Sequence, residues 1–443
     1  HGISVVTVEN AYGQLLAEGY IYSLPKKGFY VSDIKNDINN NIYLSAPKSS
    51  YIYNKKTITD TRNNNPYDKA YTYNTAIENR HDADCINLVS SHTPHDNFPF
   101  SIWAKLMRHV LTYEGESTLN VPPTGGVMQL RQAIAKHLYE FRGITVNPEQ
   151  IIIGAGTEYL YGLIVQLLGR NISYGLENPS SKKIINIYKS LGVKVNYLDM
   201  DEEGVIPDCQ GLNDSQIIQI SPSHHFPTGI VTSISRRYGL LQWANQSPDR
   251  YIIEDDYDSE FRYKGKPIPA LQGYDRWEKV IYIGTFSKSI APSIRVSYMV
   301  LPAPLLKEFQ KKSSFLSSTV ARVDQLILQK FIEDGHYERH LNRIRTLYKS
   351  RHDTLMGCLK TFQKICTISG ENAGVHMLLH FAGDMTEEEL IRKAAEKGVR
   401  VYGLSQYYID PPDGLKPTIM LGYANISEDK MKEAVKLLEE AWK

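Results

Sequence analysis

The sequence predicts an α/β protein built on a mostly parallel sheet, with a smaller α+β part toward its C-terminal end. From Cys85 onward, short apolar runs alternate with amphipathic segments, which is the pattern of strands joined by helical crossovers. The chain has 443 residues, a length typical of two or three domains, and an apolar fraction of 42%. That composition is sufficient for a sizeable hydrophobic core.

Composition also limits the kinds of partner. Fifty basic and 49 acidic residues nearly cancel, so any contact with nucleic acid has to come from a local patch. The four cysteines show no CxxC spacing, which argues against zinc or a disulfide framework and for a cytoplasmic location. We find no signal peptide and no membrane-length apolar run, and expect no membrane partner. His336 and His340 lack a third ligand, so we expect no metal site.

The first 33 residues predict a helix followed by a hairpin. Residues 3–19 have a helical period, and Gly19 suits the position after the helix end. Two short strands, 20–22 and 29–31, flank a turn that carries Lys26 and Lys27. Because His1 lies within what looks like a structured element, we expect further sequence before it.

Residues 34–84 are rich in Asn, Asp, Lys, Tyr and Ser and have no lasting apolar period, which is typical of a linker. The remaining residues, 85–443, form the main part, with the smaller α+β portion mainly at 301–443. Its expected helices are residues 103–113, 130–141, 159–168, the mostly helical stretch 305–359, and 428–443. Its expected strands are residues 150–153, 173–176, 193–198, 216–220, 251–254, 280–283, 296–301, 375–380 and 418–422.

Lys288 is the first candidate for chemistry, because it lies in a tight loop between two predicted strands. A lysine in such a loop is often only solvated, but four other features change that interpretation, one of which is the polar turn 221–229 after a strand. Asp255 ends a buried strand, where ligands of parallel sheets bind. The turn 154–157 opens a helix whose free N–H groups suit a phosphate, and Arg295 can add a bidentate charge.

Together these features predict pyridoxal phosphate, a phosphorylated cofactor with a lysine-reactive carbonyl. Lys288 would form the Schiff base, as a lysine with a lowered pKa can. Asp255 would keep the pyridine nitrogen protonated, and Tyr257 would donate to the ring oxygen. The other residues assigned to the cofactor are Gly156, Thr157, Thr285, Ser287 and Arg295 at the phosphate, and His225 in the polar turn 221–229.

Two sets of motifs carry a resemblance to known families. Residues 4–20 and 27–31 resemble the recognition helix and wing of GntR-type winged-helix regulators. The runs 255–263 and 284–288, Arg295, the turn 222–229 and the runs 335–340 and 421–424 resemble the MocR/GabR regulators, which fuse a winged helix to a fold-type-I aminotransferase-like domain.

This resemblance implies a transcriptional regulator that binds pyridoxal phosphate, double-stranded promoter DNA and a small-molecule effector. It implies a head-to-tail homodimer, with base and phosphate contacts from Ser4, Thr7, Lys26 and Lys27. The residues before the hairpin would then be part of a winged helix-turn-helix.

The sequence departs from the family pattern where substrates or effectors bind. Lys183 and Gln406 are the effector-binding candidates, and both stand where relatives have arginine. Met420 occupies the place of the substrate-carboxylate arginine, and Phe226 that of an asparagine at the ring oxygen. We therefore expect at most partial, half-reaction aminotransferase activity. The effector is either an amino compound or pyridoxal phosphate itself, as in a PdxR-like control of vitamin B6 synthesis. The alternatives are an aminotransferase with an N-terminal extension and a purely structural module.

Overall fold

The computed structural model describes residues 4–24, 27–32, 85–88, 97–263 and 268–443. Lys26 and the expected linker, residues 34–84, lie outside these ranges. The described helices include none with the length and apolar character needed to cross a membrane.

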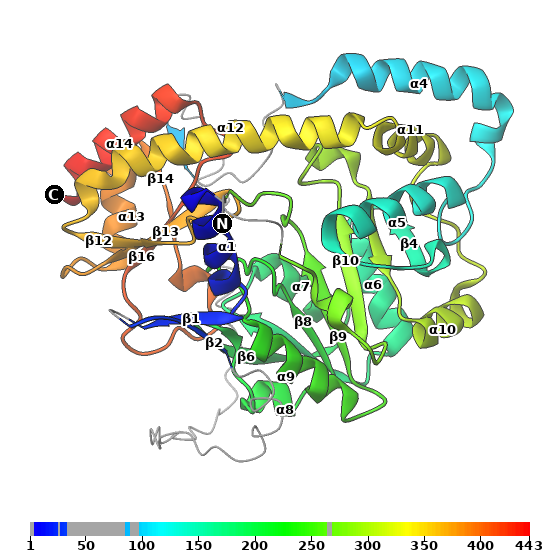
Figure 1. The fold of residues 1–443 in the computed structure, drawn as a ribbon, viewed down its shortest axis with the longest axis horizontal. Coiled ribbons are helices and arrows are strands. Elements are labelled where there is room, and N and C mark those ends of the chain that lie inside the picture. The colour runs from blue at the N-terminus through cyan, green and yellow to red at the C-terminus, as the bar shows by residue number, and fades with distance from the viewer. Residues whose placement is uncertain (1–3, 25–26, 33–84, 89–96, 264–267) are drawn as a thin grey trace, which may run out of the picture.

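A mixed eight-stranded sheet organises the larger part of the protein (Figure 1). Its strand order is β4-β11-β10-β9-β8-β5-β6-β7, and β10, β9, β8, β5 and β6 are mutually parallel. The mostly parallel sheet is thus confirmed. Its strands are β4 (Ile151–Gly154), β5 (Ser173–Asn178), β6 (Lys194–Asp201), β7 (Gly204–Val205), β8 (Ile217–Ile220), β9 (Tyr251–Asp256), β10 (Val280–Thr285) and β11 (Ser297–Val300).

Helices cover both faces of this sheet, because successive side chains of each strand point to opposite sides. On β10, Val280 and Tyr282 pack toward one layer and Ile281 and Ile283 toward the other. The first layer contains α5 (Met128–Arg142), α9 (Ile234–Asn245) and α11 (Arg322–Glu333), with α4 (Phe100–Glu114) packed outside α11 and α8 (Gln210–Asn213) beside β6. The second layer contains α6 (Thr157–Leu168), α7 (Lys182–Ser190) and α10 (Ala303–Ser313).

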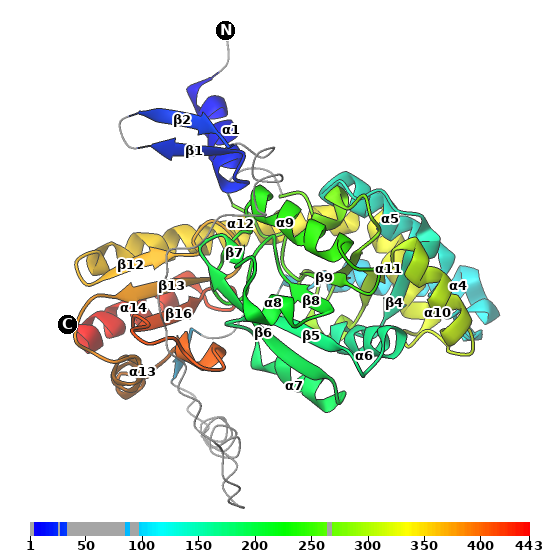
Figure 2. The same cartoon turned by 90° about the horizontal axis from the view of Figure 1, so that it is seen from below.

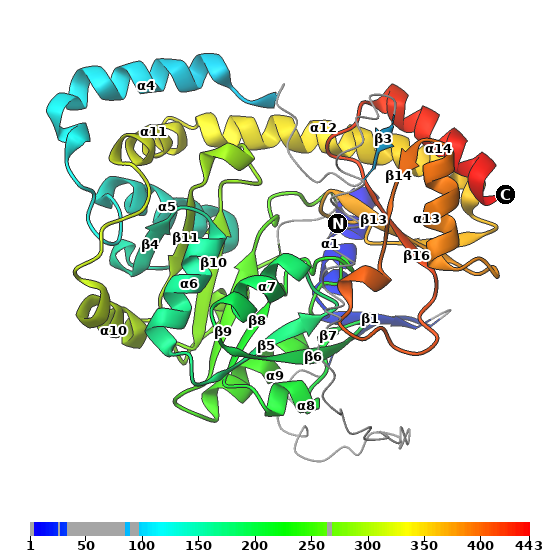
Figure 3. The ribbon, with the colours of Figure 1, turned by 180° about the vertical axis from the view of Figure 1, so that it is seen from behind.

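The long helix α12 (His336–Cys358) runs from the large sheet to a smaller α+β part (Figure 3). There, the antiparallel sheet β12-β13-β16-β15 packs with α13 (Glu387–Glu396) and α14 (Glu428–Trp442). The apolar residues of α10 and α11 pack on the large sheet, and the buried residues of the smaller core are Leu88 and residues within 355–442, with Ile86 and Tyr263 packed against them. The strands here are β3 (Ile86–Asn87), β12 (Cys366–Ser369), β13 (His376–Phe381), β14 (Val399–Arg400), β15 (Tyr402–Gly403) and β16 (Thr418–Gly422).

The N-terminal unit stands out from this body (Figure 2). It contains the expected helix, α1 (Val5–Ala17), and the expected antiparallel hairpin of β1 (Ile21–Leu24) and β2 (Gly28–Val31). Tyr12 packs against Phe29 with ring centroids 4.9 Å apart. The unit touches the larger part where the backbone N–H of Ile234 donates to the Glu18 carbonyl at 3.1 Å.

Candidate functional site

The carboxyl ends of β9 and β10 meet at a cavity of about 400 Å³. The two strands are parallel neighbours, with Asp255 paired to Ile283, so the loop after β10 opens on the same space as the end of β9. This is the sheet edge where ligands of α/β proteins bind. Eight of the predicted cofactor and effector residues line the cavity: Thr157, Lys183, Asp255, Tyr257, Thr285, Ser287, Lys288 and Arg295.

Asp255 is a buried carboxylate held by two neutral donors. Its Oδ2 accepts from the Tyr161 hydroxyl at 2.6 Å and from Gln219 Nε2 at 3.0 Å. Burial raises the pKa of Asp255 to about 6, although the hydrogen bond from Tyr161 acts in the opposite direction. A cationic ligand atom, such as a protonated ring nitrogen, would stabilise the charged carboxylate in this place.

Lys288 lies in the loop between β10 and β11, as predicted. Burial lowers the pKa of its amine, while the nearby charge of Asp258 acts against that shift. A lowered pKa increases the fraction of neutral amine, the form that attacks a carbonyl. Tyr257 is also fixed, because its hydroxyl lies 3.2 Å from Nδ1 of His224, and the same nitrogen lies 2.9 Å from Asp258 Oδ2.

The opposite end of the cavity is suited to an anion. Helix α6 begins at Thr157 and directs its free N–H groups there. Gly156 has a φ of 92°, and a Cβ at this position would crowd Arg295 and lie 2.9 Å from Glu158 Oε2. Arg295 adopts the left-handed region with a φ of 48°, an uncommon conformation for a residue other than glycine. Ser287 Oγ is buried and has no hydrogen-bond partner among the described residues.

Glu158 was not predicted, yet it lies between the two cations of this end. Its Oε1 contacts Lys183 Nζ, and its Oε2 contacts Arg295 Nη2. From the sequence, Glu158 was recognisable only as an acidic residue at the start of a helix, where a negative charge is commonly stabilising. Its partners, however, lie 25 and 137 residues further along the chain, a distance that local patterns do not bridge.

The structure leaves three candidates outside the lining. Gly156 is the residue that precedes α6. His225 Nδ1 lies 2.7 Å from Thr228 Oγ1, and its Nε2 lies 3.6 Å from Oε2 of Glu177, which does line the cavity. Burial lowers the pKa of His225 to about 3, so its ring is neutral.

Gln406 is the third candidate outside the lining. It belongs to the 3-10 turn Ser405–Tyr407, and its Nε2 is buried without a hydrogen-bond partner in the described ranges. The ring of the adjacent Tyr407 lies 5.2 Å from that of Phe226, a lining residue.

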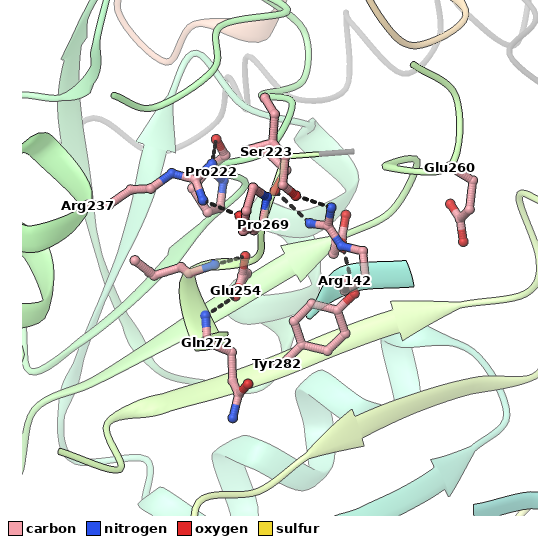
Figure 4. A network of polar contacts seen from close by, with 12 residues as sticks. Arg142, Pro222, Ser223, Arg237, Glu254, Glu260, Pro269, Gln272 and Tyr282 are labelled. Atoms are coloured by element: carbon pink, nitrogen blue, oxygen red, sulfur yellow. Dashed lines mark hydrogen bonds and ion pairs between the residues drawn. The ribbon is translucent and has the colours of Figure 1, made fainter. Parts of the chain in front are cut away.

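A buried polar network joins Arg142 of α5 and Arg237 of α9 to the turn at Pro222 and Ser223 (Figure 4). Arg142 Nε lies 2.8 Å from Asp256 Oδ2, and its Nη2 donates to Ser223 Oγ at 2.8 Å. Arg237 Nη2 donates to the Pro222 carbonyl at 2.7 Å. These bonds tie the turn that carries the lining residues Ser221 and Phe226 to β9 and α9, so the wall is rigidly placed.

These residues fit pyridoxal phosphate. The cavity offers an amine of lowered pKa, a buried carboxylate for a ring nitrogen, and an anion-binding end. At that end, Ser287 Oγ is unpaired within the described residues, and Gly156 has a φ of 92°, a backbone conformation that favours glycine. The roles of these residues toward the cofactor remain predictions.

The fold and the site define the class of protein. Residues 83–438 match the family model for aminotransferase class I and II, whose members use pyridoxal phosphate. The multiple substrate aminotransferase of Thermococcus profundus aligns with a TM-score of 0.73 and 23% identity, over 83% of this chain and 94% of that one. Aspartate aminotransferase of Thermus thermophilus aligns with a TM-score of 0.69 and 19% identity, over 86% and 100%. The chain thus has the fold-type-I aminotransferase fold that the motifs indicated.

Relatives found by sequence similarity define the family more narrowly than the fold does. The HTH-type transcriptional regulator YdeL of Bacillus subtilis is 38% identical over 100% of this chain and 89% of its own length. The probable rhizopine catabolism regulatory protein MocR of Rhizobium meliloti is 30% identical over 100% and 87%. The HTH-type pyridoxine biosynthesis transcriptional regulator PdxR of Corynebacterium glutamicum is 30% identical over 70% and 67%. The chain belongs to this MocR-type family of HTH-type transcriptional regulators, which confirms the family predicted from its motifs.

Proposed function

We propose that this protein regulates transcription by binding promoter DNA through its N-terminal unit and pyridoxal phosphate through its aminotransferase-like domain. The observation that supports this proposal most strongly is that Lys288, Asp255 and Arg295 line one cavity. The chain that contains this cavity is similar over its whole length to a transcriptional regulator. The proposed division is residues 1–33 for DNA, 34–84 for a linker and 85–443 for the effector domain. The site of action is the cytoplasm, where promoter DNA lies and free cysteines such as Cys85 stay reduced.

Each residue of the cavity has a proposed role. Lys288 anchors the cofactor through its amine, Asp255 pairs with the ring nitrogen, and Tyr257 donates to the ring oxygen. The phosphate is held by Gly156, Thr157, Thr285, Ser287 and Arg295. His225 acts indirectly, through Glu177. The bound cofactor supplies an electron-withdrawing ring, and the protein supplies its orientation.

We propose pyridoxal phosphate as the effector, with Lys183 and Gln406 near the position where an amino compound would otherwise bind. Met420, at the place of the substrate-carboxylate arginine, is buried in a small apolar cluster with Leu378 and Leu404. Such a cluster gives a carboxylate neither a charge nor a donor, so an amino acid would bind weakly. This favours a role in the control of vitamin B6 synthesis over a response to an amino compound.

DNA contact is assigned to the N-terminal unit. Ser4 caps α1 by accepting from the Thr7 backbone N–H at 3.2 Å, and both residues lie on its exposed first turn. Lys27 is exposed at the hairpin turn, next to Lys26 in the sequence. In this proposal the first turn of α1 reads bases, and the lysines of the hairpin contact phosphates.

The second partner is another copy of the chain, in a head-to-tail homodimer. Large apolar side chains are exposed on α4 and beside it, a feature that monomers seldom retain. They include Phe100, Leu111 and Tyr113 on α4 and Leu119 in the 3-10 turn that follows it. Sedimentation of the cofactor-bound protein should give twice the mass of the chain, and a monomer at micromolar concentration would reject this part of the proposal.

Visible absorbance tests the central claim. Wild-type protein saturated with pyridoxal phosphate should show the band of a lysine-bound cofactor, and Lys288→Ala should not. A colourless wild-type protein would refute the proposal and would favour a purely structural domain. Mobility shifts on the protein's own upstream region, with and without pyridoxal phosphate, test the DNA role, and an unchanged shift and unchanged transcription would reject sensing of this cofactor.

The competing function is an aminotransferase with an N-terminal extension. It is supported by the match to aminotransferase class I and II over residues 83–438. It predicts multiple turnovers with an amino acid and a keto acid, whereas the regulator predicts at most one half-reaction. Product formation beyond one equivalent per cavity would favour the enzyme.

A further inference from the structure

Glu158 places a negative charge inside the cation pair that faces the anion end of the cavity. Its two oxygens contact different partners, Oε1 with Lys183 and Oε2 with Arg295, and all three side chains line the cavity. Lys183 comes from α7, and Arg295 from the loop between β10 and β11. The Glu158 carboxylate therefore links α7 to the loop between β10 and β11.

Glu158 is ionised at neutral pH. Partial burial opposes ionisation, but the hydrogen bond with Lys183 and the charges of Lys183 and Arg295 outweigh it and keep the pKa of this carboxyl below its usual value. An incoming phosphate dianion needs Arg295, and it gains from the effector-binding candidate Lys183, because Glu158 holds both cations beside the start of α6. Glu158 and the phosphate thus have overlapping partners and like charge.

We propose that Glu158 competes with the cofactor phosphate for Lys183 and Arg295, and thereby lowers the affinity of the cavity for phosphorylated pyridoxal. This inference rests on the proposed function, since it concerns the same cavity. It gives the site a physical basis for exchange. A cofactor that must displace an internal carboxylate is held less tightly than one that enters an unoccupied cation pair, so occupancy follows the free concentration of pyridoxal phosphate.

The proposal separates two compounds that differ only in the phosphate. Pyridoxal carries the carbonyl and the ring but no dianion, so Glu158 has nothing to compete with when pyridoxal binds. Replacing Glu158 with glutamine keeps the size of the side chain and removes its charge. The variant should therefore change binding of pyridoxal phosphate and leave binding of pyridoxal unaffected.

The experiment titrates cofactor-free wild-type and Glu158→Gln protein with pyridoxal phosphate and, separately, with pyridoxal, followed by the visible band. Glu158→Gln should bind pyridoxal phosphate about three- to tenfold more tightly, the range expected for releasing two partly exposed ion pairs. Its affinity for pyridoxal should stay within twofold of wild type. Inorganic phosphate should also compete with pyridoxal phosphate more strongly in the variant.

A charge-matched control is Glu140→Gln on α5, where Glu140 is exposed and pairs only with Lys136 at 3.9 Å in the described residues. It should leave both affinities unchanged. Should Glu158→Gln fail to fold, as judged by circular dichroism, Glu158→Ala removes the same charge with the residue of highest helix propensity.

Three results would overturn the inference: a gain smaller than threefold for pyridoxal phosphate, weaker binding, or an equal gain for both compounds. Weaker binding would make Glu158 a residue that positions Arg295. Failure of the proposed function has a different signature, because the wild-type protein would then show no band with either compound.

Discussion

Replacing Arg142 with methionine tests whether the buried network holds the cavity wall. Methionine has a similar length and is apolar, so the change removes the charge and the donors while filling much of the space. It leaves Asp256 as a carboxylate that is 3% exposed and accepts a hydrogen bond from the Tyr282 hydroxyl at 2.5 Å. It also removes the donor to Ser223 Oγ.

The expected cost follows from the burial of the pair. Arg142 and Asp256 are both 3% exposed at a separation of 2.8 Å, and removing one partner of such a pair typically costs roughly 3–5 kcal/mol. The same helix provides the matched control. Lys136 is 75% exposed and lies 3.9 Å from Glu140, so Lys136→Met should cost less than about 1 kcal/mol.

Urea unfolding of the cofactor-free proteins, followed by tryptophan fluorescence, measures both variants. Arg142→Met should lower the free energy of unfolding by at least about 2 kcal/mol more than Lys136→Met. A difference below about 1 kcal/mol would refute the reasoning, since it would mean that Asp256 is solvated or neutralised without its arginine.

Two further predictions concern the cavity and the N-terminal unit. Burial raises the pKa of Glu177 from 4.5 to about 8. Between these two values the folded state keeps a proton that the unfolded chain releases, so the stability of the wild-type protein should fall as pH rises from 4.5 to about 8. Glu177→Gln should flatten that part of the curve in urea midpoints measured across this window, and equal slopes would contradict the shift. The hydroxyls of Tyr20 and Tyr274 lie 3.1 Å apart and join the N-terminal hairpin to the larger domain. Tyr274→Phe should leave the titration with cofactor unchanged. It should reduce the effect of pyridoxal phosphate on DNA affinity, measured by fluorescence anisotropy, by up to about fivefold. An unaltered effect would exclude this contact as a route of coupling between the two parts.

Features that are local in the sequence were predictable. Lys288 and Asp255 follow apolar runs that form adjacent parallel strands, and the carboxyl ends of such strands share one edge. The partners of Asp255 were not predictable, because Tyr161 and Gln219 lie 94 and 36 residues away. The pairing of Glu158 with Lys183 and Arg295 was hidden for the same reason.

Helices α7, α9 and α13 were not predicted from the hydrophobic period, and a physical reason explains the first two. In α9 the buried face includes the charged Arg237, which interrupts the apolar pattern. Helix α7 begins with Lys182 and Lys183, at the end where positive charge is unfavourable. Helix α13 had a readable start, since Thr386 and Glu389 form a capping box that the sequence already displays.

In the proposed function the cavity keeps the groups for a cofactor, whereas Met420 stands at the place of the substrate-carboxylate arginine. Charge-assisted hydrogen bonds contribute roughly 1.5–3 kcal/mol each, so an arginine replaced by the buried Met420 forfeits about ten- to a hundredfold in affinity for such a substrate. The groups assigned to the cofactor ring do not suffer this loss, because Asp255 and Tyr257 remain in the lining. When an amino acid and pyridoxal phosphate compete for the cavity, its occupancy then depends mainly on the concentration of pyridoxal phosphate. A site of this kind is better suited to report the concentration of pyridoxal phosphate than to consume amino acids.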